Sequence, residues 1–271
     1  MHEIIFLGCA MLLTGVVAGI MAGLLGVGGG LVIVPMLEFA LGFMGVDASI
    51  RMQIAVATSL ATIIPTSIAS SRAHFKKNSV DLPLAKKWTP WILAGSLAGA
   101  WVASQVHSNV LSAVFAVVTL LVAVKLILPL DEKTLTRRLP KHPAIYSAPT
   151  LIGFISTLMG IGGGSLSVPV LTFFGESVHR AVGTAALFGF IIAVPGTLGF
   201  IYTGLDNPLL PIGSAGFVSL IGFALLAPTT TLTAPLGARL AHKMEKRHLT
   251  LLFGVFLLVV SVRMFTQTFE S

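Results

Sequence analysis

A glycine-rich segment that interrupts a long apolar stretch occurs twice in this chain of 271 residues. When residues 24–37 are aligned with residues 158–171, eight of the fourteen positions are identical, and both copies carry three consecutive glycines followed five residues later by a proline. In lipid, a backbone that leaves the helix must find polar partners inside the protein or in a water-filled cavity. Interrupted apolar segments in matching halves are the best sequence indicator of a transporter's binding site. The duplication therefore predicts a broken helix in each of two halves and a ligand site near the breaks.

The composition excludes a soluble globular protein. Only 10% of the residues are charged and 55% are hydrophobic, whereas about 25% of the residues of an average soluble domain are charged. Apolar runs at residues 4–25, 110–127 and 249–264 approach or reach the roughly 17–25 residues of a membrane-spanning helix. The net charge of +7 comes from basic residues in short loops between such runs, which indicates membrane topology rather than binding of nucleic acid. The sequence predicts an all-α polytopic membrane protein in a lipid bilayer.

A polar segment at residues 131–142 divides the chain into two similar halves. We expect a transmembrane repeat at residues 1–130, a cytoplasmic linker at 131–145 and a second transmembrane repeat at 146–271. Each repeat is expected to hold five helical segments, of which the second is too short to cross the membrane easily and forms half of a re-entrant or broken pair. The expected segments are 4–25, 31–43, 50–73, 88–106 and 110–129, then 146–160, 165–175, 178–202, 209–240 and 248–266.

Loop charges indicate that the two repeats have opposite orientations. The connection after the third segment is basic in the first half (residues 76–87) and has no Lys or Arg in the second (203–208). The next connection reverses this pattern, because residues 105–109 lack Lys and Arg whereas residues 242–248 contain them. Basic loops stay in the cytoplasm, so equivalent loops face opposite sides, as in inverted repeats. We expect both termini outside and the linker inside.

The two glycine turns form the predicted substrate site. Each precedes a helix start, where unpaired N–H groups and the helix dipole favour an anion. Hydroxyl groups in the third segments, and one after the second turn, would complete the shell. The alternatives are tight helix packing for the glycines and bonding to the helix's own carbonyls for the hydroxyls. The predicted substrate-binding residues are Gly28, Gly29, Gly30, Leu31, Thr58, Ser59, Gly162, Gly163, Gly164, Ser165 and Thr184.

Charged residues near segment ends are candidates for an electropositive vestibule that attracts anions, with snorkelling to the interface as the alternative. They are Arg51, Arg72, Arg180 and Arg239. Glu38, after the first glycine turn, is either a proton-coupling carboxylate or a residue that faces the outer interface, and we expect the interface. The sequence holds no Walker motif, no metal-spaced His/Cys cluster and no nucleophile–base arrangement, so we expect no enzyme, no metal and no cofactor.

Several segments together resemble the sulfite exporter TauE/SafE family of prokaryotic and plant membrane proteins, over nearly the whole chain. They are the two Gly-Gly-Gly-x-x-x-Val-Pro-x-Leu motifs, Ala-Val-Ala-Thr-Ser at 55–59, residues 73–81, and Pro-Leu-Gly-Ala-Arg-Leu-Ala at 235–241.

The resemblance implies a secondary transporter, typically an exporter, of small sulfur-containing anions such as sulfite, thiosulfate or organosulfonates in the cytoplasmic membrane of a prokaryote. The lack of an ATP-binding motif favours coupling to protons or another ion, or simple facilitation. The alternatives are an anion channel with the glycine turns as its filter and a membrane scaffold without transport activity.

Overall fold

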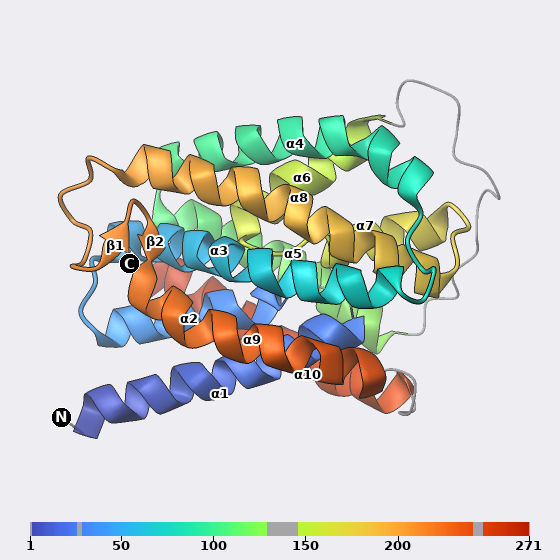
Figure 1. Cartoon of the computed structure of the whole chain (residues 1–271). Coiled ribbons are helices and arrows are strands. Elements are labelled where there is room, and N and C mark those ends of the chain that lie inside the picture. The colour runs from blue at the N-terminus through green and yellow to red at the C-terminus, as the bar shows by residue number, and fades with distance from the viewer. Residues whose placement is uncertain (1, 26–28, 129–145, 241–245, 271) are drawn as a thin grey trace.

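The computed structural model describes residues 2–25, 29–128, 146–240 and 246–270 (Figure 1). Within these ranges the chain forms ten helices and one two-stranded hairpin, which confirms the expected all-α class. The helices of the first half are α1 (His2–Leu25), α2 (Gly30–Phe43), α3 (Ala48–Phe75), α4 (Leu82–Gln105) and α5 (Ser108–Ile127). Those of the second are α6 (Ser147–Met159), α7 (Gly164–Phe173), α8 (Val178–Gly204), α9 (Leu220–Leu240) and α10 (Lys246–Glu270), with the strands β1 (Ser214–Ala215) and β2 (Val218–Ser219) before α9.

Side-chain caps fix the starts of the long helices. Asp47 Oδ1 accepts a hydrogen bond of 2.8 Å from the N–H of Ser49 at the start of α3, and Asp81 Oδ1 accepts one of 3.0 Å from the N–H of Leu84 at the start of α4. Both are N-cap bonds that satisfy free N–H groups of the first turn. The hydroxyl and N–H of Ser49 hold the pKa of Asp47 below its ordinary value, so this cap stays ionised at neutral pH.

Three of the described helices are too short to cross a membrane alone. α2 has 14 residues, α6 has 13 and α7 has 10, which correspond to about 21, 20 and 15 Å at 1.5 Å per residue, against a hydrocarbon core of about 30 Å. In Figure 1 the end of α1 and the start of α2 lie inside the molecule, and their other ends lie on the left. The end of α6 and the start of α7 also lie inside, but their other ends lie on the right. Both chain termini lie on the left (Figure 1).

The two halves exchange helices. α3 packs against α8 at the centre, while α1 packs against α9, α6 against α4, and α5 against α10. The first helix of each half therefore lies on the fourth helix of the other half. Glycines allow the close approach of these helices: a Cβ at Gly95 of α4 would collide with the carbonyl oxygen of Thr150 in α6, and one at Gly237 of α9 with that of Ile20 in α1. Small residues at helix interfaces are typical of membrane proteins.

The expected start of one helix is wrong. Residues 209–219 form a loop and the hairpin rather than the beginning of a helix, and α9 starts at Leu220. Pro211 has no N–H to donate, and Gly213 and Gly216 have φ angles of 85° and 53°, which lie in the left-handed region that glycine adopts without strain. These residues end any helical pattern before α9.

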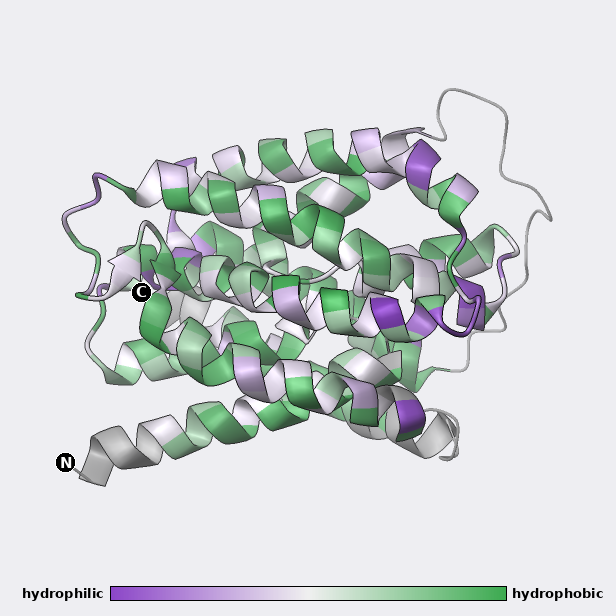
Figure 2. Ribbon diagram, viewed as in Figure 1, coloured by the Kyte–Doolittle hydropathy of each residue, from purple (hydrophilic) through white to green (hydrophobic). Residues whose placement is uncertain are grey.

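The outer surface is largely apolar. Leu13, Trp101 and Leu121 are each 65% exposed, and α3, α5, α8 and residues 220–237 of α9 are long and apolar enough to cross a membrane by length and composition. Figure 2 shows hydrophilic residues gathered at one end of the molecule, where α3 ends and α4 begins. This distribution is that of a multi-pass membrane protein whose flanks contact lipid.

Candidate functional site

The two glycine segments touch in the interior of the molecule. Gly30, the first residue of α2, packs against the turn that follows α6, where an added Cβ would collide with the carbonyl oxygen of Gly160 and lie 2.8 Å from Cα of Ile161. Gly160 itself has a φ of 65° and ends α6. Gly29 has a φ of 76°, whereas Gly163 at the matching position has a φ of −58°, so the two turns differ in backbone conformation. Gly28 lies outside the described residues.

Helix α3 supports the contact between the turns. The hydroxyl of Ser59 donates a hydrogen bond of 2.7 Å to the carbonyl oxygen of Gly160, and a Cβ at Gly160 would lie 2.7 Å from Cα of Val56. Ser59 is fully buried, and Leu31 at the start of α2 is 1% exposed. The predicted site residues Gly30, Leu31 and Ser59 thus lie beside the second glycine turn, and the proton of Ser59 is directed at that turn.

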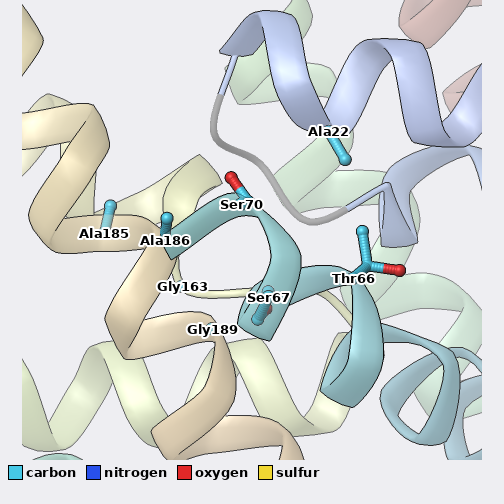
Figure 3. Close-up of a pocket in the computed structure, with 9 residues that line it drawn as sticks. Ala22, Thr66, Ser67, Ser70, Gly163, Ala185, Ala186 and Gly189 are labelled. Carbon is cyan, nitrogen blue, oxygen red and sulfur yellow. The ribbon is translucent and has the colours of Figure 1, made fainter. Parts of the chain in front are cut away.

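A small pocket with a cavity volume of about 10 Å³ lies beside this junction. In Figure 3 its labelled residues come from the Gly163 segment and from α1, α3 and α8. Its lining consists of small and hydroxyl residues: Ala22, Thr66, Ser67, Ser70, Gly162, Gly163, Ala185, Ala186 and Gly189. None of these described lining residues is charged. Gly162 and Gly163 are the two predicted site residues that line the pocket.

One unpartnered hydroxyl lines the pocket, and a second lies two residues after Gly163. The Ser70 hydroxyl is buried with no hydrogen-bond partner, and so is the Ser165 hydroxyl in the first turn of α7. In α7 the N–H of Ser167 bonds to the carbonyl of Gly163, which leaves the preceding N–H groups of Gly164, Ser165 and Leu166 without intrahelical acceptors. The start of α7 therefore presents free N–H groups and the positive end of its dipole close to an uncharged pocket.

Ser67 and Gly189 approach one another across the pocket. A Cβ at Gly189 of α8 would lie 2.6 Å from the Ser67 hydroxyl oxygen of α3 and 3.8 Å from the N–H nitrogen of Gly163. The space left by the missing side chain of Gly189 is thus bounded by a hydroxyl and a backbone N–H. Two hydrogen-bond donors that face one small space are the groups that an oxyanion accepts from.

Thr58 and Thr184 do not line the pocket; they form two matching contacts between the halves. The hydroxyl oxygen of Thr58 in α3 accepts a hydrogen bond of 2.9 Å from the N–H of Ser219, which precedes α9. The hydroxyl oxygen of Thr184 in α8 accepts one of 2.9 Å from the N–H of Asp81, which precedes α4. Thr58 lies about 14 Å along α3 from Ser67 at 1.5 Å per residue. We call these two hydrogen bonds the threonine latches.

The four candidate arginines do not lie together. Arg51 belongs to the start of α3, whereas Arg72 belongs to its end, Arg180 to the start of α8 and Arg239 to the end of α9. In Figure 1 the start of α3 lies on the left, and the other three helix ends lie on the right. Arg180 Nη2 pairs with Asp81 at 2.8 Å and Nη1 with Glu176 at 3.9 Å. Any shared vestibule is therefore limited to the right-hand end, and the charge of Arg180 there is offset by carboxylates.

Glu38 does not face the interface, so that expectation is wrong. It is 7% exposed in α2, and its Oε1 lies 3.5 Å from Nη1 of Arg51. The turn from α2 into α3 brings Arg51 back over α2, because the N–H of Val46 bonds to the carbonyl of Leu41 and the Val46 carbonyl then accepts from Arg51. An ion pair across this turn cannot be read from the apolar pattern of either helix.

The sequence did not predict three of the residues that line the pocket, which are Ser67, Ser70 and Gly189. The hydroxyls of α3 recur at 59, 62, 66 and 70, with Ser67 beside them, and a spacing of three to four residues places them along one helix face. That spacing is the signal that was available. It extends the predicted hydroxyls of Thr58 and Ser59 toward the pocket.

A model of the sulfite exporter TauE/SafE family matches residues 11–264. The chain belongs to this family. It is 33% identical over 256 residues to a probable membrane transporter protein of Haemophilus influenzae, with 94% of this chain and 97% of that protein covered. It is 28% identical over 273 residues to one of Bacillus subtilis (94% and 96% covered) and 24% identical over 269 residues to one of Methanocaldococcus jannaschii (97% of each). No solved structure matches.

Family membership and the relatives agree on the general activity. The family is described as sulfite exporters, and all three relatives are described as probable membrane transporters that align along almost their full length. Together with the apolar helices, this identifies the chain as a multi-pass membrane transporter. The resemblance that the glycine motifs indicated is confirmed.

Proposed function

We propose that this chain is a secondary transporter that exports small sulfur-containing anions, such as sulfite, thiosulfate or an organosulfonate, across the cytoplasmic membrane of a prokaryote. The observation that supports this substrate class most directly is the uncharged pocket beside the two glycine turns, with its unpartnered Ser70 hydroxyl. Its cavity volume of about 10 Å³ gives room for about one water molecule, so the pocket must widen to bind an oxyanion.

Backbone N–H groups and hydroxyls suit a carrier that must release its anion. A buried arginine that paired with the anion in a low dielectric would hold it by a strong charge interaction, and breaking a buried ion pair is costly. The N–H groups at the start of α7 and the hydroxyls of Ser70 and Ser165 supply dipoles instead of a full charge. Gly162, Gly163, Gly164 and the first turn of α2 then act as the backbone part of the site. Thr58, Ser59 and Thr184 shape it through the helices that they tie together.

We also propose that the two halves, 1–130 and 146–271, are inverted repeats that give alternating access. The start of α1 and the end of α2 lie on the left in Figure 1, whereas the start of α6 and the end of α7 lie on the right. The threonine latches are supporting evidence, because each joins the third helix of one half to the residue that precedes the fourth helix of the other. We expect rocking of one half against the other to break one of these two hydrogen bonds and to keep the other.

Labelling of single cysteines tests the inversion. With Cys9 replaced by serine, Asn207→Cys and Lys76→Cys each place one thiol in equivalent connections, α8–α9 and α3–α4. In intact cells a membrane-impermeant maleimide should modify the thiol at 207 and should modify the one at 76 only after lysis, because the basic loop stays in the cytoplasm. Equal labelling of both positions in intact cells contradicts the inverted arrangement.

Ser70→Ala should separate ligand binding from stability. Ser70 is 6% exposed, and its buried hydroxyl has no hydrogen-bond partner. Removal of this hydroxyl relieves an unsatisfied polar group, so the melting temperature of the free protein should stay unchanged or rise. Anion binding should weaken, because a charge-assisted hydrogen bond contributes about 1.5–3 kcal/mol. The measurement is a thermal-shift screen of the detergent-purified protein with sulfite, thiosulfate, sulfate, sulfoacetate and taurine, since binding to the folded state raises its stability.

The control is Ser71→Ala, a neighbour on the same helix whose hydroxyl donates to the carbonyl of Ile68 at 3.3 Å. This variant should keep the anion-induced shift of the wild type. If no sulfur anion shifts the wild-type transition, the proposed substrate class fails. If Ser70→Ala keeps the full shift, the binding site lies elsewhere.

Counterflow distinguishes a carrier from a channel. In proteoliposomes, labelled thiosulfate uptake by a carrier saturates and is accelerated by unlabelled thiosulfate on the opposite side. A channel gives no such acceleration. We expect acceleration, because alternating access exposes the site to one side of the membrane at a time.

A further inference from the structure

Glu38 is a buried carboxylate in which one of the two oxygen atoms has no hydrogen-bond partner. Its side chain is 9% exposed, and Oε1 lies 3.5 Å from Arg51 Nη1. Oε2 is buried and has no hydrogen-bond partner. A buried charged oxygen without a donor costs free energy, and a bound proton removes that charge. Ionisable residues inside membrane segments are expensive and usually functional.

Arg51 keeps its position whether or not Glu38 is ionised. Its Nε and Nη2 donate to the carbonyl of Val46 at 3.3 and 3.0 Å, and its Nη1 packs against Gly42, where a Cβ would lie 2.9 Å away. Val46 belongs to the turn between α2 and α3. Protonation of Glu38 therefore loosens the attraction between α2 and α3 while the arginine stays fixed on α3.

The surroundings of Glu38 hold few other charges. Among the described residues of the elements that pack on α2, the charged groups near it are Arg51 of α3, Asp47 at the start of α3, and Arg263 of α10, whose guanidinium lies 4.3 Å from the ring centre of Phe39. Asp47 bonds to Ser49. The residues of α1 and α9 that line the neighbouring cavity against α2 are Ala10, Met11, Thr14 and Leu226. Arg51 is thus the group that opposes the charge of Glu38.

One short helix carries both Glu38 and the first glycine turn. Gly30 begins α2 at the contact with Gly160, and Glu38 lies about 12 Å further along the same helix at 1.5 Å per residue. A change in the attachment of α2 to α3 therefore acts on the helix whose first residue contacts the second glycine turn, and that second turn lines the pocket. In the proposed orientation Glu38 lies on the outer side, from which the proton-motive force delivers protons.

We propose that Glu38 is a proton-binding site that couples inward proton movement to outward anion movement. The proposal rests on the transport function given above and adds the chemical class of the coupling ion. Ionised Glu38 holds α2 against Arg51, and the protonated carboxyl releases it. Oε2 accepts the proton, and the proton leaves again when movement of α2 restores the ion pair with Arg51.

The test measures proton movement and anion exchange in the same proteoliposomes. Vesicles with trapped pyranine, clamped with valinomycin and potassium, receive thiosulfate or sulfoacetate, neither of which takes up a proton near neutral pH. The wild type should change the internal pH when an anion gradient is imposed. Glu38→Gln should keep counterflow of the labelled anion and lose the pH change to the level of empty vesicles. Glu38→Asp should keep both.

Asp206→Asn is the control, because Asp206 is an exposed carboxylate in the connection between α8 and α9, outside the proposed site, and it should behave as the wild type. Anion exchange by the wild type without a pH change overturns the proton site and leaves the transport function standing. A Glu38→Gln variant that still moves protons with the anion also overturns it. If neither anion exchanges in the wild type, the transport function fails and this inference with it.

A second measurement does not depend on a variant that folds. Dicyclohexylcarbodiimide reacts with protonated carboxyl groups in apolar surroundings, and mass spectrometry of the treated wild type should find Glu38 modified. Modification should abolish the pH change in the vesicle assay. Modification of other carboxylates with Glu38 untouched at acid pH contradicts the proposal.

Discussion

Gly189→Ala should leave the protein folded and weaken anion binding by about tenfold or more. The new methyl group would lie 2.6 Å from the Ser67 hydroxyl oxygen and 3.8 Å from the N–H nitrogen of Gly163. The nearer atom is the end of a side chain that can rotate away, so folding tolerates the change. The methyl nevertheless fills the space that two donors face, and a bound oxyanion loses both donors and room. We expect anion affinity to fall by about tenfold or more, since 1.4 kcal/mol corresponds to a factor of ten.

Gly196→Ala provides the matched control on the same helix. A methyl at Gly196 meets side-chain methyl groups of Leu60 and Thr157 at 3.0 and 3.1 Å, away from the residues that line the pocket. Both variants should elute as single peaks and melt near the wild-type temperature. In the thermal-shift screen the Gly196→Ala protein should respond to the anion and the Gly189→Ala protein should respond more weakly. The opposite pattern would mean that the pocket beside Gly163 is not the binding site.

The broad architecture could be predicted from the sequence because its evidence is local. A run of three glycines disfavours a continuous helix, and the recurrence of this pattern predicted two short helices, which the structure contains as α2 and α7. The prolines of the pattern lie inside these helices. The start of α9 was misplaced because apolar residues 209–219 satisfy a hydropathy pattern. The left-handed glycines at 213 and 216, rather than hydropathy, decide the backbone there.

The site was harder to predict because its contacts join distant parts of the chain. Thr58 and Thr184 occupy equivalent positions, which the repeat indicated, but their hydroxyls meet N–H groups of Ser219 and Asp81 in the other half. A pattern that shows that two residues are equivalent does not show what faces them. Ser70 lies one helical turn beyond Thr66 on the same face of α3. Only the packing of α8 and the Gly163 segment makes it part of a pocket.

The exchange of helices between halves explains why glycine recurs outside the two turns. The first helix of each half packs against the fourth helix of the other half, so the interfaces α1–α9 and α4–α6 hold the two halves together. Gly15 and Gly19 face Thr229 and Thr233 in the first interface, and Gly95 and Gly99 face Thr150 and Phe154 in the second. Without a strong hydrophobic force between helices in lipid, close packing supplies much of the attraction. These interfaces therefore fix how the two turns meet.

Gly95→Ala should destabilise the whole protein. The added methyl would collide with the carbonyl oxygen of Thr150 and lie 3.0 Å from the N–H nitrogen of Phe154, and both are backbone atoms of α6 that cannot rotate away. Overpacking of a well-packed interface costs about 1–3 kcal/mol and occasionally more. In detergent the variant should aggregate at a lower temperature than the wild type, as followed by the loss of the monodisperse peak after heating.

Gly8→Ala supplies the comparison for a glycine that packs against nothing. A Cβ at Gly8 of α1 meets no atom within 4 Å, and alanine favours a helix interior over glycine by about 1 kcal/mol, so this variant should be as stable as the wild type or more so. If the Gly95→Ala and Gly8→Ala variants lose their monodisperse peak at the same temperature, the backbones of α4 and α6 are not in close contact at Gly95. In that case the halves would be joined by the α1–α9, α5–α10 and α3–α8 contacts, and the second glycine turn would be free to move independently of α4.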